Sequence, residues 1–163
     1  MKKRGFTLVE LLVMLVVLGI LTAITIPNVV GILQNNREDA MFDDAYRLYE
    51  LVLAKDAVTK IKPTSDSVCK KITMESLDLN QDFKSGPNGG TYNKEDSYVL
   101  IKRVTDAGVI KYKYCVRIVE EKDGEKYGID LATIDKISKK DTNILNNITT
   151  TPNNSDCQCS SIE

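Results

Sequence analysis

The stretch that decides the fold is GFTLVE at residues 5–10, followed by LLVMLVVLGILTAITI at residues 11–26. One glycine and two threonines are all that interrupt this apolar run, and the low-charge sequence continues to residue 33. About 20 residues of α-helix, rising ~1.5 Å per residue, cross the hydrocarbon core of a bilayer. Residues 6–33 are therefore predicted to form a hydrophobic transmembrane helix.

The charges around this run predict its orientation. Lys2, Lys3 and Arg4 are the only charges on its N-terminal side. Basic residues stay on the cytoplasmic side of a spanning helix, so the N-terminal tip is expected in the cytoplasm and everything after residue 33 outside.

An ordinary secretory signal peptide explains the N-terminus poorly. The apolar run exceeds a typical h-region of ~7–15 residues, and a small-x-small cleavage site is missing around residues 22–25. A plain signal anchor explains the length but not Glu10, because an acidic residue deep in a membrane costs roughly 2.5–3.5 kcal/mol. Glu10 is therefore expected to have a function and a partner that neutralises it.

The motif at residues 5–12, together with VVLGILTAITIP at residues 16–27, resembles the class III signal of type IV pilins and the related pseudopilins. The resemblance implies that residues 1–5 are a leader, that a prepilin peptidase cleaves after Gly5, and that the new N-terminal Phe6 is N-methylated. It also implies as partners other pilin subunits, the proteins of an assembly platform, and the cytoplasmic membrane before assembly.

Two residues of the apolar segment are candidates for assembly. In a filament core, the Glu10 carboxylate of one subunit can pair with the Phe6 ammonium of its neighbour, which offsets burial and penalises other registers. Pro27 removes an amide donor inside the helix, so a kink or local melting is expected near residues 23–27. Loss of the leader leaves 19 basic against 23 acidic side chains, so the net charge shifts from -1 to about -4.

The rest of the chain, residues 34–163, is predicted to be a soluble head. The helix should continue over residues 34–62, because Met41, Ala45, Leu48 and Val52 recur at helical spacing and would bury one face. Residues 63–96 are predicted to be a loop region with a short helix near residues 68–77.

From residue 97 the apolar period changes to two, which predicts an antiparallel sheet over residues 97–138. Three strands are expected at residues 98–104, 109–121 and 126–134, with turns at 107–108 and 123–124. The tail, residues 139–163, should be irregular unless its cysteines hold it. The predicted fold is therefore α+β, with a long N-terminal helix packed through its C-terminal half on an antiparallel sheet of at least three strands.

All four cysteines lie in the part predicted to be extracytoplasmic: Cys69, Cys115, Cys157 and Cys159. An even number of cysteines there favours disulfides. A bond within the C-x-C pair would be strained, so Cys69 and Cys115 are each expected to pair with one of the two tail cysteines, in either combination. A four-thiolate zinc site and free or partly free thiols remain as alternatives.

Composition excludes several kinds of chemistry. Histidine is absent, which removes Ser-His-Asp and Cys-His catalysis and every imidazole metal ligand. The head carboxylates form no evident acid/base pair and are expected on the solvated surface, Glu120 and Asp130 among them. The net charge gives no sign of a specific nucleic-acid partner. We therefore expect no enzyme activity, no cofactor and no metal.

These features predict a structural subunit of a type IV pilus, polymerised through its N-terminal helix and serving surface attachment or motility. It would be held in the cytoplasmic membrane with the N-terminus inside before assembly, and would lie in an extracellular fibre afterwards. The alternatives are a pseudopilin of a type II secretion or DNA-uptake machine, and a signal-anchored extracytoplasmic sensor or enzyme.

Overall fold

The computed structural model describes residues 6–66, 68–79, 83–148, 152 and 154–162, with the backbone alone at residues 25, 27 and 28. The chain divides into two compact units, Met1–Asn36 and Arg37–Glu163.

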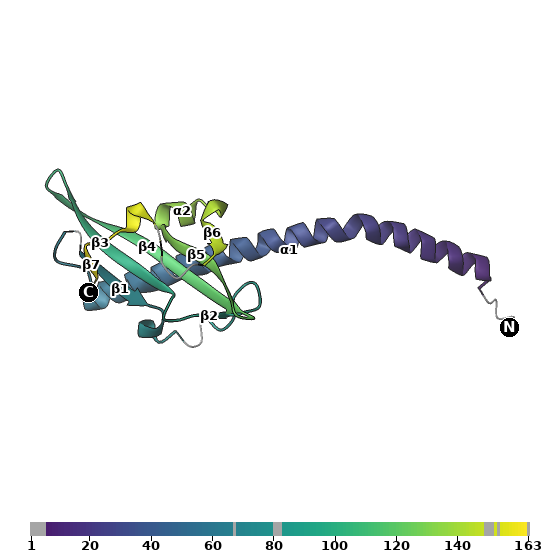
Figure 1. Ribbon diagram of the computed structural model, residues 1–163, viewed down its shortest axis with the longest axis horizontal. Coiled ribbons are helices and arrows are strands. Elements are labelled where there is room, and N and C mark those ends of the chain that lie inside the picture. Colours follow the sequence, from purple (N-terminus) through teal and green to yellow (C-terminus); the bar gives the residue numbers. More distant parts are fainter. Residues whose placement is uncertain (1–5, 67, 80–82, 149–151, 153, 163) are drawn as a thin grey trace. The chain divides into compact units, whose positions relative to one another are not determined.

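One helix, α1, runs from Leu8 to Thr59 (Figure 1). It continues through Pro27 without a break in its helical backbone, so the local melting expected there is not found. The helix ends three residues before the predicted residue 62. Lys60 adopts a left-handed backbone with φ 49°, and its N–H donates to the carbonyl of Asp56 at 2.9 Å. This left-handed residue ends the helix ahead of Pro63.

The second unit contains a seven-stranded sheet among the residues that the structure describes. The strands are β1 (Val68–Thr73), β2 (Thr91–Tyr92), β3 (Tyr98–Asp106), β4 (Val109–Lys122), β5 (Glu125–Thr133), β6 (Leu145–Asn147) and β7 (Ser161–Ile162). The strand order is β6-β5-β4-β3-β1-β7, with β2 beside β4, and all pairs are antiparallel except β1 with β7. The expected α+β class and the antiparallel sheet are confirmed.

The two hairpins of the sheet turn where the sequence predicted. Ala107 and Gly108 have φ 49° and 79°, and Asp123 and Gly124 have φ 52° and 85°. Positive φ at both turn positions is the two-residue geometry that matches the twist of paired strands. These turns place β3, β4 and β5 side by side as a meander.

The structure corrects three sequence predictions. Residues 68–73 form strand β1 rather than a helix, because they pair with β3, and only the 3-10 turn η1 (Glu75–Leu77) is helical in this stretch. Residues 63–96 are thus not a plain loop region. The sheet strand predicted to reach residue 134 ends at residue 133, where the short helix α2 (Ile134–Ser138) begins.

The tail is more ordered than its composition suggested. It contains the 3-10 turns η2 (Thr142–Ile144) and η3 (Ser155–Cys157), and it supplies β6 and β7 at the two edges of the sheet. The backbone groups of β6 pair with β5 and those of β7 pair with β1. This backbone pairing orders the tail, which has few apolar side chains to bury.

The core lies between the head part of α1 and one face of the sheet. Met41, Ala45, Leu48 and Val52 are fully buried, as the helical spacing predicted. They belong to one cluster with sheet residues that include Val99, Ile101, Val116, Ile118 and Ile129. A second, smaller cluster lies on the opposite face of the strands and contains Cys69, Tyr98, Leu100, Cys115, Leu131 and Cys157. Successive residues of β4 therefore belong to opposite faces of the sheet, with Val116 and Ile118 in the first cluster and Cys115 in the second.

Candidate functional site

The N-terminal part of α1 carries the predicted processing and assembly residues. Gly5 lies outside the described residues, and Phe6, next to the expected cleavage point, is 74% exposed. Thr7 precedes the first helical residue. Its N–H and its hydroxyl both donate to Glu10 Oε2 at 2.9 Å, and the Glu10 N–H donates to Thr7 Oγ1 at 3.3 Å.

This reciprocal arrangement is a capping box, in which the residue before the helix and the residue three positions later satisfy each other's polar groups. The Glu10 carboxylate thus has a hydrogen-bonding partner within its own chain. A contact of Glu10 with any other molecule would have to compete with Thr7.

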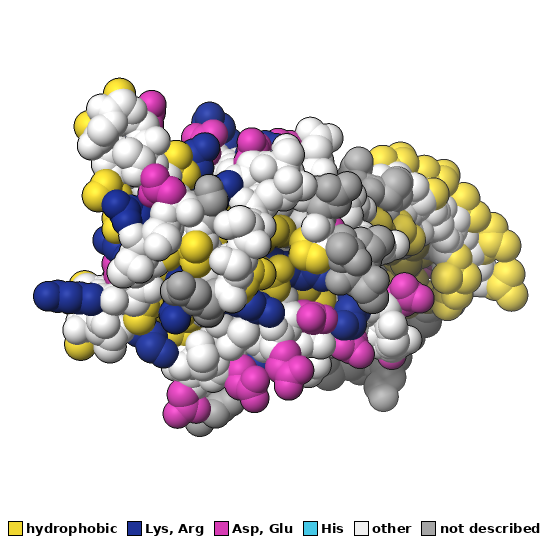
Figure 2. Space-filling view, turned by 60° about the vertical axis from the view of Figure 1, so that its left-hand side comes forward, with side chains coloured by type: hydrophobic (Ala, Val, Ile, Leu, Met, Phe, Trp, Pro, Cys, Tyr) yellow, Lys and Arg dark blue, Asp and Glu magenta, His cyan; other side chains and the backbone are white. Residues whose placement is uncertain are grey.

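The described apolar side chains that follow, up to Leu33, are exposed. Large hydrophobic residues from Leu8 to Leu33 have between 49% and 83% of their surface exposed. Hydrophobic side chains (yellow) gather over this part of the helix in Figure 2. α1 is long and apolar enough at this end to span a membrane, and none of the most apolar window is buried inside the chain. Such a surface needs lipid or other helices around it.

Comparison with known proteins agrees with this segment. Residues 1–26 match the family model described as the prokaryotic N-terminal methylation motif. A search of curated proteins found no match. A search of solved structures also found none. The match confirms the class III prepilin signal and supports a type IV pilin-like family for the chain, as the precursor of a pilin or a pseudopilin.

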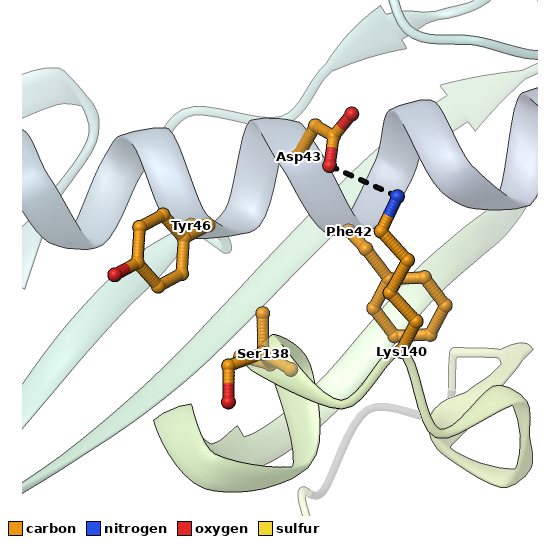
Figure 3. A pocket seen from close by; sticks show the side chains of 6 residues that line it. Phe42, Asp43, Tyr46, Ser138 and Lys140 are labelled. Atoms are coloured by element: carbon orange, nitrogen blue, oxygen red, sulfur yellow. Dashed lines mark ion pairs between the residues drawn. The ribbon is translucent and has the colours of Figure 1, made fainter.

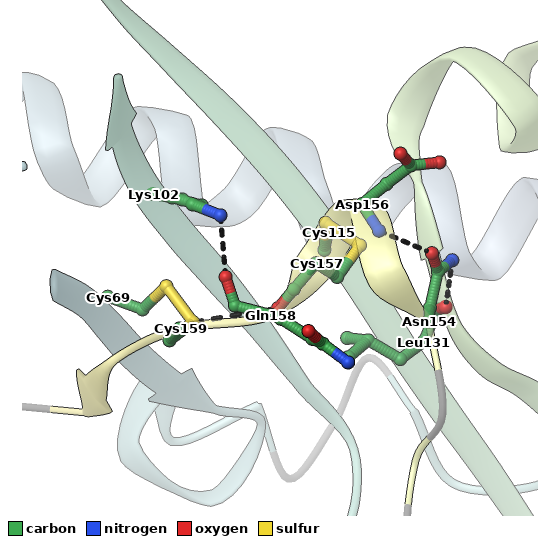
Figure 4. The surroundings of a disulfide bond; sticks show 9 residues. All are labelled: Cys69, Lys102, Cys115, Leu131, Asn154, Asp156, Cys157, Gln158 and Cys159. Carbon is green, nitrogen blue, oxygen red and sulfur yellow. Dashed lines mark hydrogen bonds between the residues drawn. A yellow bond between two sulfur atoms is a disulfide. The ribbon is translucent and has the colours of Figure 1, made fainter. Parts of the chain in front are cut away.

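The four cysteines form two disulfides on the outer face of the sheet, where Figure 4 shows both. Cys69 on β1 is bonded to Cys159, and Cys115 on β4 is bonded to Cys157 on η3. This is one of the two combinations that the sequence left open. All four thiols are used, so the structure contains neither the thiolate zinc site nor the free thiols considered as alternatives.

Polar contacts add to these bonds in holding the tail. Lys102 Nζ donates to the Gln158 carbonyl at 2.6 Å, and Asn154 Nδ2 donates to the Leu131 carbonyl at 2.9 Å (Figure 4). The tail residues 154–159 are therefore fastened across β3, β4 and β5. Sequence reasoning predicted the tail's attachment through cysteines but had no signal for its path.

Glu120 corrects the expectation that the head carboxylates are solvated. It is 1% exposed, and its carboxylate accepts the N–H of Gly90 at 2.7 Å, the N–H of Asn88 at 3.1 Å and Asn88 Nδ2 at 3.0 Å. The turn Ser85-Gly86-Pro87-Asn88-Gly89-Gly90 thus wraps a buried acid of β4. Gly86 allows this approach, because a Cβ there would lie 2.3 Å from Glu120 Cδ.

A second acid is half-buried close to the first. The hydroxyl of Tyr92 on β2 donates to Asp44 Oδ2 on α1 at 2.5 Å. Burial raises the pKa of Asp44, opposed by this hydrogen bond and by Arg47, while the charge of Glu120 adds to the rise. These contacts join β2 and its preceding loop to the helix. Nothing in the sequence pattern brings these residues together. Asp130 is also partly buried, in an ion pair with Arg117.

A small cavity of about 260 Å³ lies between α1 and α2, and Figure 3 shows side chains that line it. Phe42 and Tyr46 line it from the helix, and Ser138 and Lys140 from the opposite side. Lys140 reaches across to Asp43 at 3.3 Å and to Asp39 at 3.1 Å. These two ion pairs of Lys140 hold the chain that follows α2 against α1. Among the described residues, no three or more acidic or cysteine side chains gather as a metal site would require.

Proposed function

We propose that the protein is a structural subunit of a type IV pilus, which polymerises through α1 and presents its head for surface attachment or motility. The observation that carries this proposal is the prepilin signal at residues 1–26, continuous with an exposed apolar helix. In this role the chain performs no catalysis of its own.

The assembly step follows from the charges of the mature N-terminus. Cleavage after Gly5 removes all three basic side chains of the leader and creates an ammonium at Phe6. In the bilayer, the Thr7 cap satisfies the Glu10 carboxylate of each separate subunit. In the filament, the ammonium of a neighbour can replace the neutral Thr7 donors, and a charged donor makes the stronger hydrogen bond. A subunit in a wrong register would leave both charges unpaired among apolar helices.

The first experiment identifies the mature N-terminus. The full chain is co-expressed with a prepilin peptidase and analysed by mass spectrometry of its N-terminal peptide. Methylated Phe6 is expected. An intact Met1 or a cut near Ala23 would contradict the proposal.

The second experiment tests Glu10. Glu10→Ala should leave the head folded and the precursor cleaved but should prevent incorporation into filaments. Glu50→Ala is the matched control, since Glu50 is an exposed glutamate farther along the same helix. Normal filaments containing the Glu10→Ala subunit would overturn the register role.

A third experiment separates the pilus from its alternatives. If the chain is a pilus subunit, filaments sheared from the cell surface should contain it as a repeating component. Its retention in the envelope, together with loss of secretion or of DNA uptake when it is deleted, would instead identify a pseudopilin.

A further inference from the structure

A cavity of about 510 Å³ lies at the end of β5, where the chain passes into α2. Its volume falls within the range of ~300–1,000 Å³ typical of small-molecule sites. One wall is aromatic, with Tyr49 from α1 and Tyr112 and Tyr114 from β4. The rings of Tyr49 and Tyr114 meet edge to face, 5.2 Å apart. All three tyrosines are only partly buried, and the Lys62 ammonium lies 4.9 Å from the centre of the Tyr112 ring, over one of its faces.

The rim of this cavity supplies polar groups of both signs. Lys113 contributes an ammonium, and Asp135 and Asp156 contribute carboxylates. All three side chains belong to exposed residues. A strongly charged ligand of either sign would meet a like charge here, whereas a neutral ligand rich in hydroxyl groups can use both the donor and the acceptors.

The backbone of β4 adds hydrogen-bonding groups on the same side. The pairing of β4 with β5 begins only at Cys115. In the described part of the chain, no strand therefore pairs with residues 109–114 along the edge of β4 that faces away from β3. The two-residue turn makes Asp106 and Val109 a hydrogen-bonded pair of the hairpin, and the alternation then directs the N–H and C=O of Tyr112 and Tyr114 away from β3. These groups face the side on which the end of β5 lines the cavity.

We propose that this cavity is a saccharide-binding site for a neutral glycan. The apolar C–H face of a pyranose ring packs on the tyrosine rings, and its hydroxyls bond to the rim and to the free edge of β4. Asp156 directly precedes Cys157, so the disulfide between Cys157 and Cys115 holds Asp156 at the rim of the cavity. The site concerns the head of a single subunit and does not depend on filament assembly.

The test uses the full chain in a micelle of a detergent without a sugar headgroup, since a glycosidic detergent would compete for the site. An array of neutral glycans and of cationic and anionic peptides identifies the probe, and isothermal titration with the strongest neutral glycan measures its Kd. Binding above background to at least one neutral glycan is expected. Retention of peptides alone, or no retention, would overturn the proposal.

Variants then locate the binding. Tyr112→Leu keeps apolar volume but removes the ring, and it should weaken binding about tenfold, with Asp156→Asn having a smaller effect. Tyr46→Leu is the matched control, because Tyr46 contacts Tyr49 but lines the cavity between α1 and α2. The Tyr46→Leu protein should bind the glycan with the affinity of the wild type. Asp156 is exposed, so its variant tests the site even if Tyr112→Leu does not fold. Unchanged affinity in Asp156→Asn and in every folded Tyr112 variant would place the glycan elsewhere.

Discussion

The carboxylate of Glu120 accepts a hydrogen bond of 2.7 Å from the backbone N–H of Gly90, at a point where both groups are buried. Two backbone amides and one side-chain amide converge on this acid, so the loop before β2 depends on it for its conformation. A buried donor left without its acceptor costs ~1–3 kcal/mol.

Glu120→Ala should therefore lower the free energy of unfolding of the head by about 2–3 kcal/mol, because Gly90 and Asn88 lose their acceptor. The neighbouring and exposed Glu121→Ala serves as the control and should change stability by less than about 0.5 kcal/mol. Urea unfolding followed by near-ultraviolet circular dichroism of the tyrosines measures both. Equal midpoints for the two variants would show that the loop does not need Glu120.

Gly128 on β5 should not tolerate a side chain. Its φ is 150°, and a Cβ there would lie 2.1 Å from the carbonyl oxygen of Ile118 on β4. Gly128→Ala should cost about 2–4 kcal/mol, since the paired backbones of β5 and β4 would have to separate. Gly124→Asn is the matched control, because a side chain in that turn meets nothing within 4 Å and asparagine accepts its φ of 85°. A Gly128→Ala protein with the thermal midpoint of the wild type would refute the close approach.

The two disulfides should each contribute several kcal/mol to the stability of the head. They close segments with sequence separations of 90 and 42 residues, for which loss of unfolded-state entropy amounts to about 4 kcal/mol each. Paired replacement by serine, at Cys69 with Cys159 or at Cys115 with Cys157, should lower the thermal midpoint in both cases. Mass spectrometry of a non-reduced digest should find these two links. Peptides joining Cys69 to Cys157 would contradict the pairing.

Asp44 should make stability decrease as the pH rises above its unfolded pKa. Burial raises the pKa of Asp44 in the folded head, so the folded state holds this proton at pH values where the unfolded state has released it. Stability from this group is therefore complete below the unfolded pKa and is lost as the pH rises through the folded pKa. Asp44→Asn keeps an oxygen acceptor for Tyr92 and removes the titration.

The difference in unfolding midpoint between Asp44→Asn and wild type should shift in favour of the variant from pH 3 to pH 7. Urea unfolding at several pH values measures it, with Asp123→Asn in an exposed turn as the control. A difference that stays constant over this range would show that Asp44 titrates normally.

Local patterns predicted much of the fold. The spacing of Met41, Ala45, Leu48 and Val52 identified the buried helix face, because a helix exposes its residues with a fixed period. The turns at residues 107–108 and 123–124 followed from Gly108, Asp123 and Gly124, which accept positive φ more readily than other residues do. Residues 68–73 were misassigned because six residues of mixed polarity carry little period, and it was pairing with β3 that made them a strand.

By itself, the sequence determined the processing motif of the N-terminal segment, its apolar length and its single carboxylate, and it predicted the orientation of this segment in a membrane. These properties depend on the order of neighbouring residues, which the chain carries before it folds. The tertiary structure alone decided which cysteines pair, that Glu120 is buried in a loop of amides, and that three tyrosines from α1 and β4 share one cavity. These contacts join residues 30 to 90 positions apart, and the sheet register that brings them together is set by the packing of the whole head.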